Sequence, residues 1–224
     1  MSKRAIFLSG KRGGGASGPT TTTETTTWQV SAGGDDGWAV HAGTGSMFTS
    51  DQLIGGFFLA SGVVPYGTYA FCRFQNVTIP QGATIDTAKL TFKTLATTDG
   101  GAEYGDLDAH TFKVDAIDAD DVSAPSAASD VNDSATTTGE IVDWSLTSSV
   151  ADDADLDTPE IKTVLQEVVG RGGWESGNAV MFRYYSEETD SGDGSGSTVD
   201  CRLDCQSYEA SSSNAAKLVV TYTY

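Results

Sequence analysis

The sequence predicts an all-β protein: a two-sheet antiparallel β-sandwich of the jelly-roll type, with one short amphipathic helix and an extended N-terminal arm. Three observations support this fold class. Many short segments alternate apolar and polar residues, a single segment has apolar residues at helical spacing, and the first part of the chain is rich in small polar residues. With 224 residues, 38% of them hydrophobic, and 26 glycines against 5 prolines, the composition excludes collagen, coiled coil and a wholly disordered chain.

The strands are predicted from period-2 alternation, which places one face of each strand toward a core. At least eight segments have this pattern or flank clear turn signals. They are residues 28–30, 38–40, 69–74, 77–85, 88–93, 110–117, 139–144, 179–185 and 217–224. Within 77–85 the Pro80-Gln81-Gly82 turn predicts two strands joined by a tight corner.

The helix is predicted after the capping signal of residues 157–160. Apolar residues follow at helical spacing: Ile161, Val164, Leu165, Val168 and Val169. The glycine-rich run that starts at Gly170 ends the pattern, so we expect about three turns.

The chain divides into a flexible basic arm, residues 1–27, and a jelly-roll domain, residues 28–224. Residues 9–27 contain only Gly, Ser, Thr, Ala, Lys, Arg, Pro and Glu, so they can bury little apolar surface. The arm carries a net charge of +3, which leaves −21 on the remaining body. Its candidate assembly residues combine charge with an apolar tip: Lys3, Arg4, Ile6, Phe7, Leu8, Lys11 and Arg12. A disordered terminus is the alternative interpretation.

The overall charge of −18 and the pI near 4.1 argue against nucleic acid or an anionic membrane as a partner of the body. No apolar stretch approaches the length of a membrane span, and the run at residues 5–8 is shorter than a signal-peptide core. We therefore expect no classical signal peptide. The three cysteines, an odd number, make a disulfide framework a poor expectation.

The polar residues predict binding rather than catalysis. His41 and His110 are the two histidines, and neither has a partner at ligand spacing, so we expect no enzyme and no required cofactor. Acidic, glycine-rich connections instead offer the hard oxygen ligands that calcium prefers. The candidate ligands are Asp152, Asp153, Asp155, Asp157, Asp190 and Asp193, with the Asp35-Asp36 pair as a third cluster. Solvated acidic loops are the alternative.

Aromatic residues near predicted loops are candidates for stacking on a sugar ring. These are Trp38, Tyr66, Tyr104 and Tyr184, whereas Trp28, Trp144 and Trp174 fit a core better. Packing inside the sandwich is the alternative for each candidate aromatic as well.

Three longer phrases carry a resemblance to a known family. They are residues 74–92 (FQNVTIPQGATIDTAKLTF), 164–179 (VLQEVVGRGGWESGNA) and 215–222 (AAKLVVTY). Together they resemble the DNRLRE-like β-sandwich modules, which are grouped with carbohydrate-binding modules and occur in large bacterial surface proteins and in phage structural proteins. The resemblance implies a jelly roll that binds or displays.

A single module behind a short basic arm, without a visible export signal, favours a virion over a secreted chain. We therefore expect a non-enzymatic virion structural protein, a phage capsid decoration or head or tail fibre component exposed on the particle. Its partners would be a major capsid or tail protein and further copies of itself. The alternatives are a carbohydrate-binding adhesion module that recognises a host-surface glycan, and a self-assembling cell-surface or filament subunit.

Overall fold

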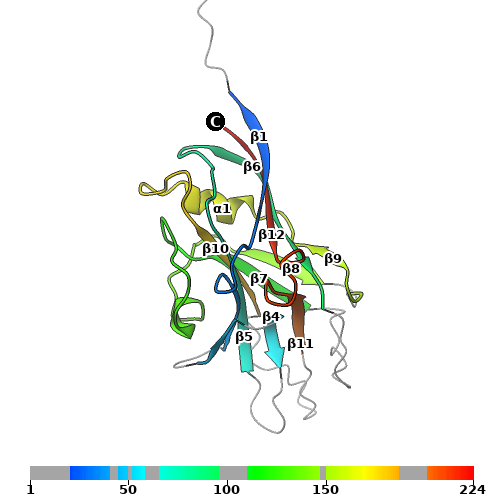
Figure 1. Ribbon diagram of the computed structural model, residues 1–224. Coiled ribbons are helices and arrows are strands. Elements are labelled where there is room, and N and C mark those ends of the chain that lie inside the picture. The colour runs from blue at the N-terminus through cyan, green and yellow to red at the C-terminus, as the bar shows by residue number, and fades with distance from the viewer. Residues whose placement is uncertain are drawn as a thin grey trace, which may run out of the picture.

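The computed structural model describes residues 21–40, 45–49, 52–58, 66–95, 110–146, 150–186 and 201–224. Two antiparallel sheets and one helix make up an all-β sandwich, which confirms the predicted fold class (Figure 1). The predicted arm up to residue 20 lies outside the described residues, as do Tyr104, Asp190 and Asp193.

The smaller sheet has the strand order β1-β12-β6-β9. Its strands are β1 (Thr23–Gln29), β12 (Lys217–Thr223), β6 (Thr84–Lys93) and β9 (Asp155–Asp157). In β12 the residues Leu218, Val220 and Tyr222 are buried and alternate with half-buried neighbours, as a sheet with one core face requires.

The larger sheet follows the path β11-β4-β5-β10-β7-β8. These strands are β11 (Cys201–Gln206), β4 (Gln52–Phe58), β5 (Tyr66–Phe74), β10 (Val180–Tyr185), β7 (His110–Ala116) and β8 (Val142–Leu146). Off this path, β2 (Asp36–Val40) pairs with β5, and β3 (Met47–Phe48) pairs with β2. A 3-10 helix, η2 (Ala128–Asp130), lies in the connection between β7 and β8.

The core between the sheets centres on an aromatic cluster. Phe92 from the smaller sheet meets Trp144 and Tyr184 from the larger one at ring-centroid distances of 5.8 and 5.3 Å. The Tyr184 hydroxyl donates to the carbonyl oxygens of Leu53 and Leu203, so its polar end is satisfied inside the core. Gly55 makes room for this ring, because a Cβ there would lie 2.3 Å from it.

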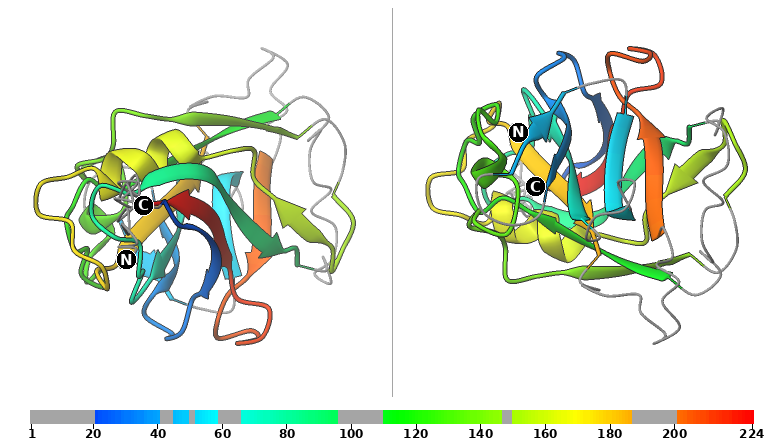
Figure 2. Two further views of the ribbon diagram at one scale, coloured as in Figure 1. Left: turned by 90° about the horizontal axis from the view of Figure 1, so that it is seen from above. Right: turned by 90° about the horizontal axis from the view of Figure 1, so that it is seen from below.

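The helix α1 (Lys162–Val169) packs on β6 and β7, and the views along the long axis place it to one side of the strands (Figure 2). Its buried face consists of Val164, Leu165, Val168 and Val169, as the sequence predicts. The helix follows residues 157–160, as the sequence predicts, but its N-cap is Ile161 and has no side-chain cap hydrogen bond. Residues 155–157 form β9, and the Thr158 hydroxyl then accepts the backbone N–H of Leu90, which holds the chain extended.

Two further boundaries differ from the sequence predictions. Strand β1 begins at Thr23, so the predicted arm boundary after residue 27 is wrong: residues 23–27 belong to the sheet. Threonine has high β-propensity, and backbone pairing with β12 along an edge needs no buried side chains. The strand predicted over residues 77–79 is absent, although Val77 and Ile79 are buried in the core.

Candidate functional site

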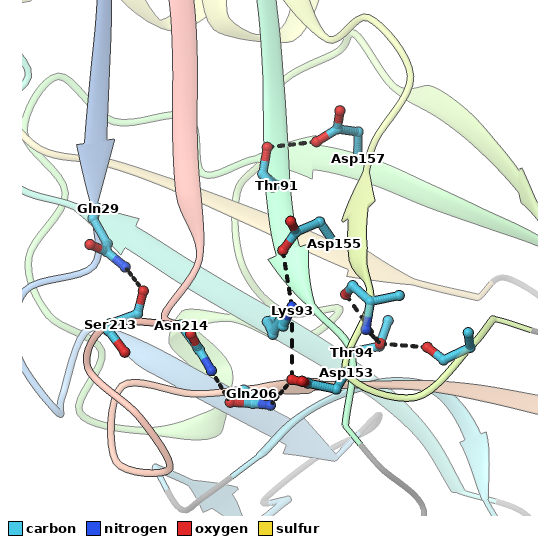
Figure 3. A network of polar contacts seen from close by, with 12 residues as sticks. Gln29, Thr91, Lys93, Thr94, Asp153, Asp155, Asp157, Gln206, Ser213 and Asn214 are labelled. Atoms are coloured by element: carbon cyan, nitrogen blue, oxygen red, sulfur yellow. Dashed lines mark hydrogen bonds and ion pairs between the residues drawn. The ribbon is translucent and has the colours of Figure 1, made fainter.

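The acidic residues predicted as calcium ligands lie in two places, an exposed edge of the smaller sheet and a buried site at the start of β2. The exposed edge is β9 with the turn before it, which lies beside β6 (Figure 3). Lys89 Nζ lies 2.5 Å from Asp157 Oδ2, and Thr91 donates its hydroxyl to the other oxygen of Asp157 at 2.6 Å. Lys93 Nζ lies 3.4 Å from Asp155 and 3.8 Å from Asp153. These two lysines offset part of the negative charge of the edge.

The predicted calcium ligands on this edge therefore lie along β9 and the turn before it, and lysine side chains face them. Burial is the largest single influence on the Asp157 pKa and raises it, but the hydrogen bonds from Lys89 and Thr91 and the charge of Lys89 together lower this pKa below its ordinary value. Within the part of the chain that the structure describes, no three His, Cys, Asp or Glu side chains are grouped so that they could hold a metal ion. Asp152 belongs to the same turn, and the calcium prediction for these loops stays a prediction.

The buried pocket contains the third acidic cluster, Asp35 and Asp36, where β2 begins. Asp35 accepts hydrogen bonds from Arg73 Nη1 at 2.7 Å and Gln75 Nε2 at 2.5 Å, so its charge is paired. Asp36 is fully buried, and its Oδ2 accepts the backbone N–H of Tyr208 at 2.9 Å. Its Oδ1 has no hydrogen-bond partner. Burial, followed by the nearby Glu209 carboxylate, raises the Asp36 pKa to about 7.

A second buried carboxylate, Asp115 on β7, has a very different environment. Arg183 on β10 donates to both of its oxygens, at 2.7 and 2.5 Å, and Arg183 also donates to the carbonyls of Val131 and Asn132. The guanidinium carbon lies 4.8 Å from the ring centroid of Tyr69 and 5.2 Å from that of Tyr185. Sequence reasoning missed this pair, and only the unusual arginine and aspartate inside two apolar strands could have indicated it.

The aromatic candidates divide in a similar way. Trp38 on β2 is half-buried and stacks on Phe48 of β3 with 4.2 Å between ring centroids and 21° between planes. Phe48 is 39% exposed, so this pair, which we call the aromatic platform, reaches the surface. Tyr184 was predicted as a glycan contact, and this is wrong: the ring lies in the core, where it completes the aromatic cluster. The side chain of Tyr66 lies outside the described residues.

The described cysteines are unsuited to nucleophilic chemistry. Cys72 and Cys205 are free and buried, and burial raises the pKa of both thiols, which keeps them protonated at neutral pH. The backbone of Cys201 belongs to the same continuous strand as Cys205, four residues away. Along such a strand this spacing corresponds to roughly 13 Å, beyond the reach of a disulfide.

A cavity of about 610 Å³ lies beside α1 and is lined in part by Ile85, Lys162, Gln166 and Glu167. Its polar lining is largely engaged in holding neighbouring loops. The Glu167 carboxylate accepts the backbone N–H groups of Gly139 and Glu140, while Gln166 bonds to the backbone of Ala83 and Ile85. These contacts attach α1 to the sandwich, so Gln166 and Glu167 have a structural role in this cavity that requires no ligand.

Comparison with known proteins adds no family name. No family model matches the chain, and no curated protein matches it significantly. Among the helices of the described ranges, none is long and apolar enough to cross a membrane.

Proposed function

We propose that this chain is a non-enzymatic structural protein of a virus particle, a phage capsid decoration or a head or tail fibre component, and that residues 1–20 attach it to a capsid or tail protein. The observation that carries the proposal is the pairing of β1 with β12. Thr22 and Tyr224 exchange backbone hydrogen bonds of 2.9 and 3.0 Å, which fixes residue 21 at one end of the sandwich. The strand ends of β4, β5 and β11 lie toward the other end (Figure 1).

The distribution of charge supports a binding role for residues 1–20 and a displayed role for the sandwich. Residues 1–20 contain four basic residues, Lys3, Arg4, Lys11 and Arg12, and no acidic one. The rest of the chain is strongly acidic, so the leading segment is attracted to a surface that the body itself would repel. In this arrangement the segment binds the particle, and the rigid sandwich is displayed from its fixed end.

The test is a truncation placed by the structure. Removing residues 1–20 leaves β1 intact, whereas removing residues 1–27 would also delete most of an edge strand. We expect the shorter truncation to keep its melting temperature and to lose its occupancy on virus particles, quantified by mass spectrometry after co-sedimentation. A full-length variant with Lys3, Arg4, Lys11 and Arg12 changed to Glu should also lose occupancy. The matched body variant Lys217→Glu should bind normally. Full occupancy of the truncated chain would refute the proposal.

The aromatic platform favours one second candidate, a carbohydrate-binding module. Two stacked rings at the surface resemble the flat apolar surface on which sugar rings pack. A glycan array probed with the wild-type chain, Trp38→Ala, Phe48→Ala and the control Tyr224→Ala tests this. Tyr224 is a comparably exposed aromatic, 47%, at the end where the chain terminates. Saturable binding that is lost in the first two variants and kept in the third would favour the glycan-binding function.

A further inference from the structure

Strand β1 stands at one end of the smaller sheet, and its outer side is an unprotected edge. It pairs with β12 over residues 23–29 without a register shift, and no other strand of the described ranges pairs with it. Proteins usually protect such an edge with proline, lysine, a bulge or a very short strand. The sequence of β1, TETTTWQ, has none of these features over its 7 residues. A further strand can therefore add to this edge.

The pairing with β12 identifies the backbone groups on the outer side of β1. Thr22 and Tyr224 exchange two backbone hydrogen bonds, of 2.9 and 3.0 Å. In an antiparallel ladder every second residue faces the partner strand, so the even-numbered residues of β1 face β12. The N–H and C=O groups of Thr23, Thr25 and Thr27 therefore point away from β12, and all three residues are exposed.

The threonine side chains agree with this alternation. The hydroxyl oxygens of Thr23 and Thr223 lie 2.8 Å apart, and those of Thr25 and Thr221 lie 2.9 Å apart. Side chains approach most closely at positions whose backbone groups do not bond to each other, as expected for these two pairs. The hydroxyl contacts lie on the exposed face of the sheet, so the backbone groups at its edge stay accessible.

The one charged side chain of β1 is engaged with its own sheet. The Glu24 carboxylate accepts the hydroxyl groups of Tyr222 and Tyr224, at 3.0 and 2.8 Å. A side chain stands above or below the plane of a sheet, and these contacts direct Glu24 toward β12. Its charge is therefore a weak obstacle to another strand at the edge.

The opposite end of the smaller sheet has the protection that β1 lacks. Strand β9 has 3 residues, and two of them are the exposed Asp155 and Asp157. Lys89 and Lys93 extend toward these carboxylates from β6. A sheet that accepts a strand at only one of its two ends joins with one other sheet of the same kind and then stops. This predicts a closed pair rather than a filament.

The shape of the molecule leaves room for a second copy along β1. The first half of β1 and the end of β12 extend beyond α1 and the larger sheet (Figure 1). Tyr224, at this end, is correspondingly exposed. A two-fold axis through this part of β1 places the two bodies at opposite ends of the joined sheet. That arrangement separates two strongly acidic bodies and so limits their repulsion.

The chain that precedes β1 favours a second copy as the partner. In an antiparallel pair, residue 21 of each copy lies near Gln29 of the other copy, because the two β1 strands run in opposite directions. Residues 1–20 contain four basic residues and no acidic one. The chain from Arg12 to residue 21 spans at most about 30 Å, so Arg12 and Lys11 can reach the surface around that Gln29.

The surface around Gln29 is acidic. Gln29 donates to two carbonyls of the β11–β12 connection, residues 207–216 (Figure 3). The exposed Glu209 belongs to this connection, and the exposed Asp153 accepts a hydrogen bond from Gln206, just before it. The basic segment of one copy is therefore attracted to this end of the other copy, which gives the antiparallel pair complementary charges.

We propose that two copies of this chain join through their β1 strands, antiparallel and about a two-fold axis at Thr25, so that the two smaller sheets become one. Thr25 then faces Thr25 of the second copy, Thr23 faces Thr27 of the second copy, and these pairs exchange the backbone hydrogen bonds of the edge. This register places Glu24 opposite Thr26, which avoids the like charge of the second Glu24. The inference goes beyond the function proposed above and does not depend on it.

The experiment uses a proline at an outward-facing position. Thr25→Pro removes an N–H that points away from β12, so the hydrogen bonds within the smaller sheet remain. Sedimentation velocity of the full-length chain from about 1 to 300 µM should show the wild type shifting from monomer to dimer. Thr25→Pro should lower the association constant roughly tenfold or more, because both hydrogen bonds at the axis are lost. The matched control Thr25→Val keeps the N–H and a high β-propensity, and it should associate like wild type.

The outcomes separate pairing through β1 from other causes. Thermal unfolding identifies variants that keep the fold, and Thr27→Pro, which also removes an outward N–H, repeats the test at a second position. A wild-type chain that stays monomeric, a folded Thr25→Pro that dimerises like wild type, or association that continues beyond a dimer would overturn the proposal. Thr25→Pro leaves residues 1–20 unchanged, so its occupancy on virus particles shows separately whether attachment fails.

Amide hydrogen exchange locates the interface residue by residue. The amide protons of Thr23, Thr25 and Thr27 should exchange more slowly at concentrations that favour the dimer. The amide of Thr26, which faces β12, should be protected at low and high concentration alike. Exchange of the three threonines that does not change with concentration, in a chain that dimerises, would contradict pairing through β1.

Discussion

The two buried aspartates, Asp115 and Asp36, differ in the residue that stands opposite each in the sheet. Asp115 on β7 faces Arg183 on β10, whereas Asp36 on β2 faces Cys72 on β5. The first carboxylate receives two charge-assisted hydrogen bonds, and the second receives one backbone hydrogen bond. Burial raises the pKa of both carboxyl groups, that of Asp36 to about 7, and only at Asp115 does a facing guanidinium oppose the rise. The residue that stands opposite each aspartate in the neighbouring strand therefore decides whether the carboxylate charge is paired.

The largest effect expected from this comparison is the loss of Arg183. Changing Arg183→Met removes the partner of a buried charge and leaves the carbonyls of Val131 and Asn132 without their donor. We expect a loss of about 3–5 kcal/mol in the free energy of unfolding, measured with denaturant at pH 7. The double variant Arg183→Met with Asp115→Leu should recover much of this loss. Equal losses in both variants would mean that the pair matters through packing alone.

Changing aspartate to asparagine should shift the free energy of unfolding in opposite directions at the two positions. At pH 8, Asp115→Asn should lower the free energy of unfolding by about 2–3 kcal/mol, because Arg183 then lacks its counter-charge. Asp36→Asn should raise it by about 1–3 kcal/mol, because an uncompensated buried charge is removed. The comparison fails if both variants are destabilised at pH 8 by similar amounts.

Salt should act on the body as a whole. With a net charge of −18, screening reduces self-repulsion more than it weakens the few exposed ion pairs, so raising NaCl from 0.1 to 1 M should raise the melting temperature by a few degrees, about 1 kcal/mol. KCl at the same concentration should raise the melting temperature, measured by calorimetry, by the same amount as NaCl. A much larger stabilisation by CaCl2 at equal ionic strength would instead indicate specific binding at acidic loops.

The smallest effect belongs to the exposed ion pairs. Lys113 Nζ lies 2.7 Å from Asp143 Oδ1 between β7 and β8, and the Asp143 side chain is 65% exposed. Changing Lys113→Ala should cost at most about 1 kcal/mol in denaturant unfolding at 0.1 M salt, and less at 1 M. A cost approaching that of Arg183→Met would remove the distinction between buried and exposed pairs.

Local patterns predicted the elements that have a core face. Alternation in residues 88–93 and 217–224 reflects burial on one side of a sheet, and those strands are present. The strand predicted over residues 69–74 is also present, as part of β5, and it is buried on both faces. The spacing of Val164, Leu165, Val168 and Val169 likewise predicted the buried face of α1. In these segments the burial of each side chain follows from its own sequence neighbourhood.

What could not be predicted depends on residues distant in the sequence. The threonine run of β1 has no apolar pattern, and it is a strand because β12 pairs with it almost 200 residues later. From its sequence neighbours Asp36 is predicted to lie in a solvated turn, whereas in the structure the distant residues Cys72 and Tyr208 enclose it. Tyr184 was expected at a surface because it lies near the end of a predicted strand, yet Gly55 opens a space for it in the core.

The β1–β12 pairing also constrains how the protein is made. Among the described strands β1 pairs with β12 alone, so this outermost strand has no hydrogen-bonding neighbour until residues 217–223 have left the ribosome. The larger sheet consists of residues up to 206, so it can assemble earlier than the strand that begins the domain. Completion of the smaller sheet therefore waits until β12 has been synthesised, and a premature stop codon before residue 217 would leave the first strand without its partner.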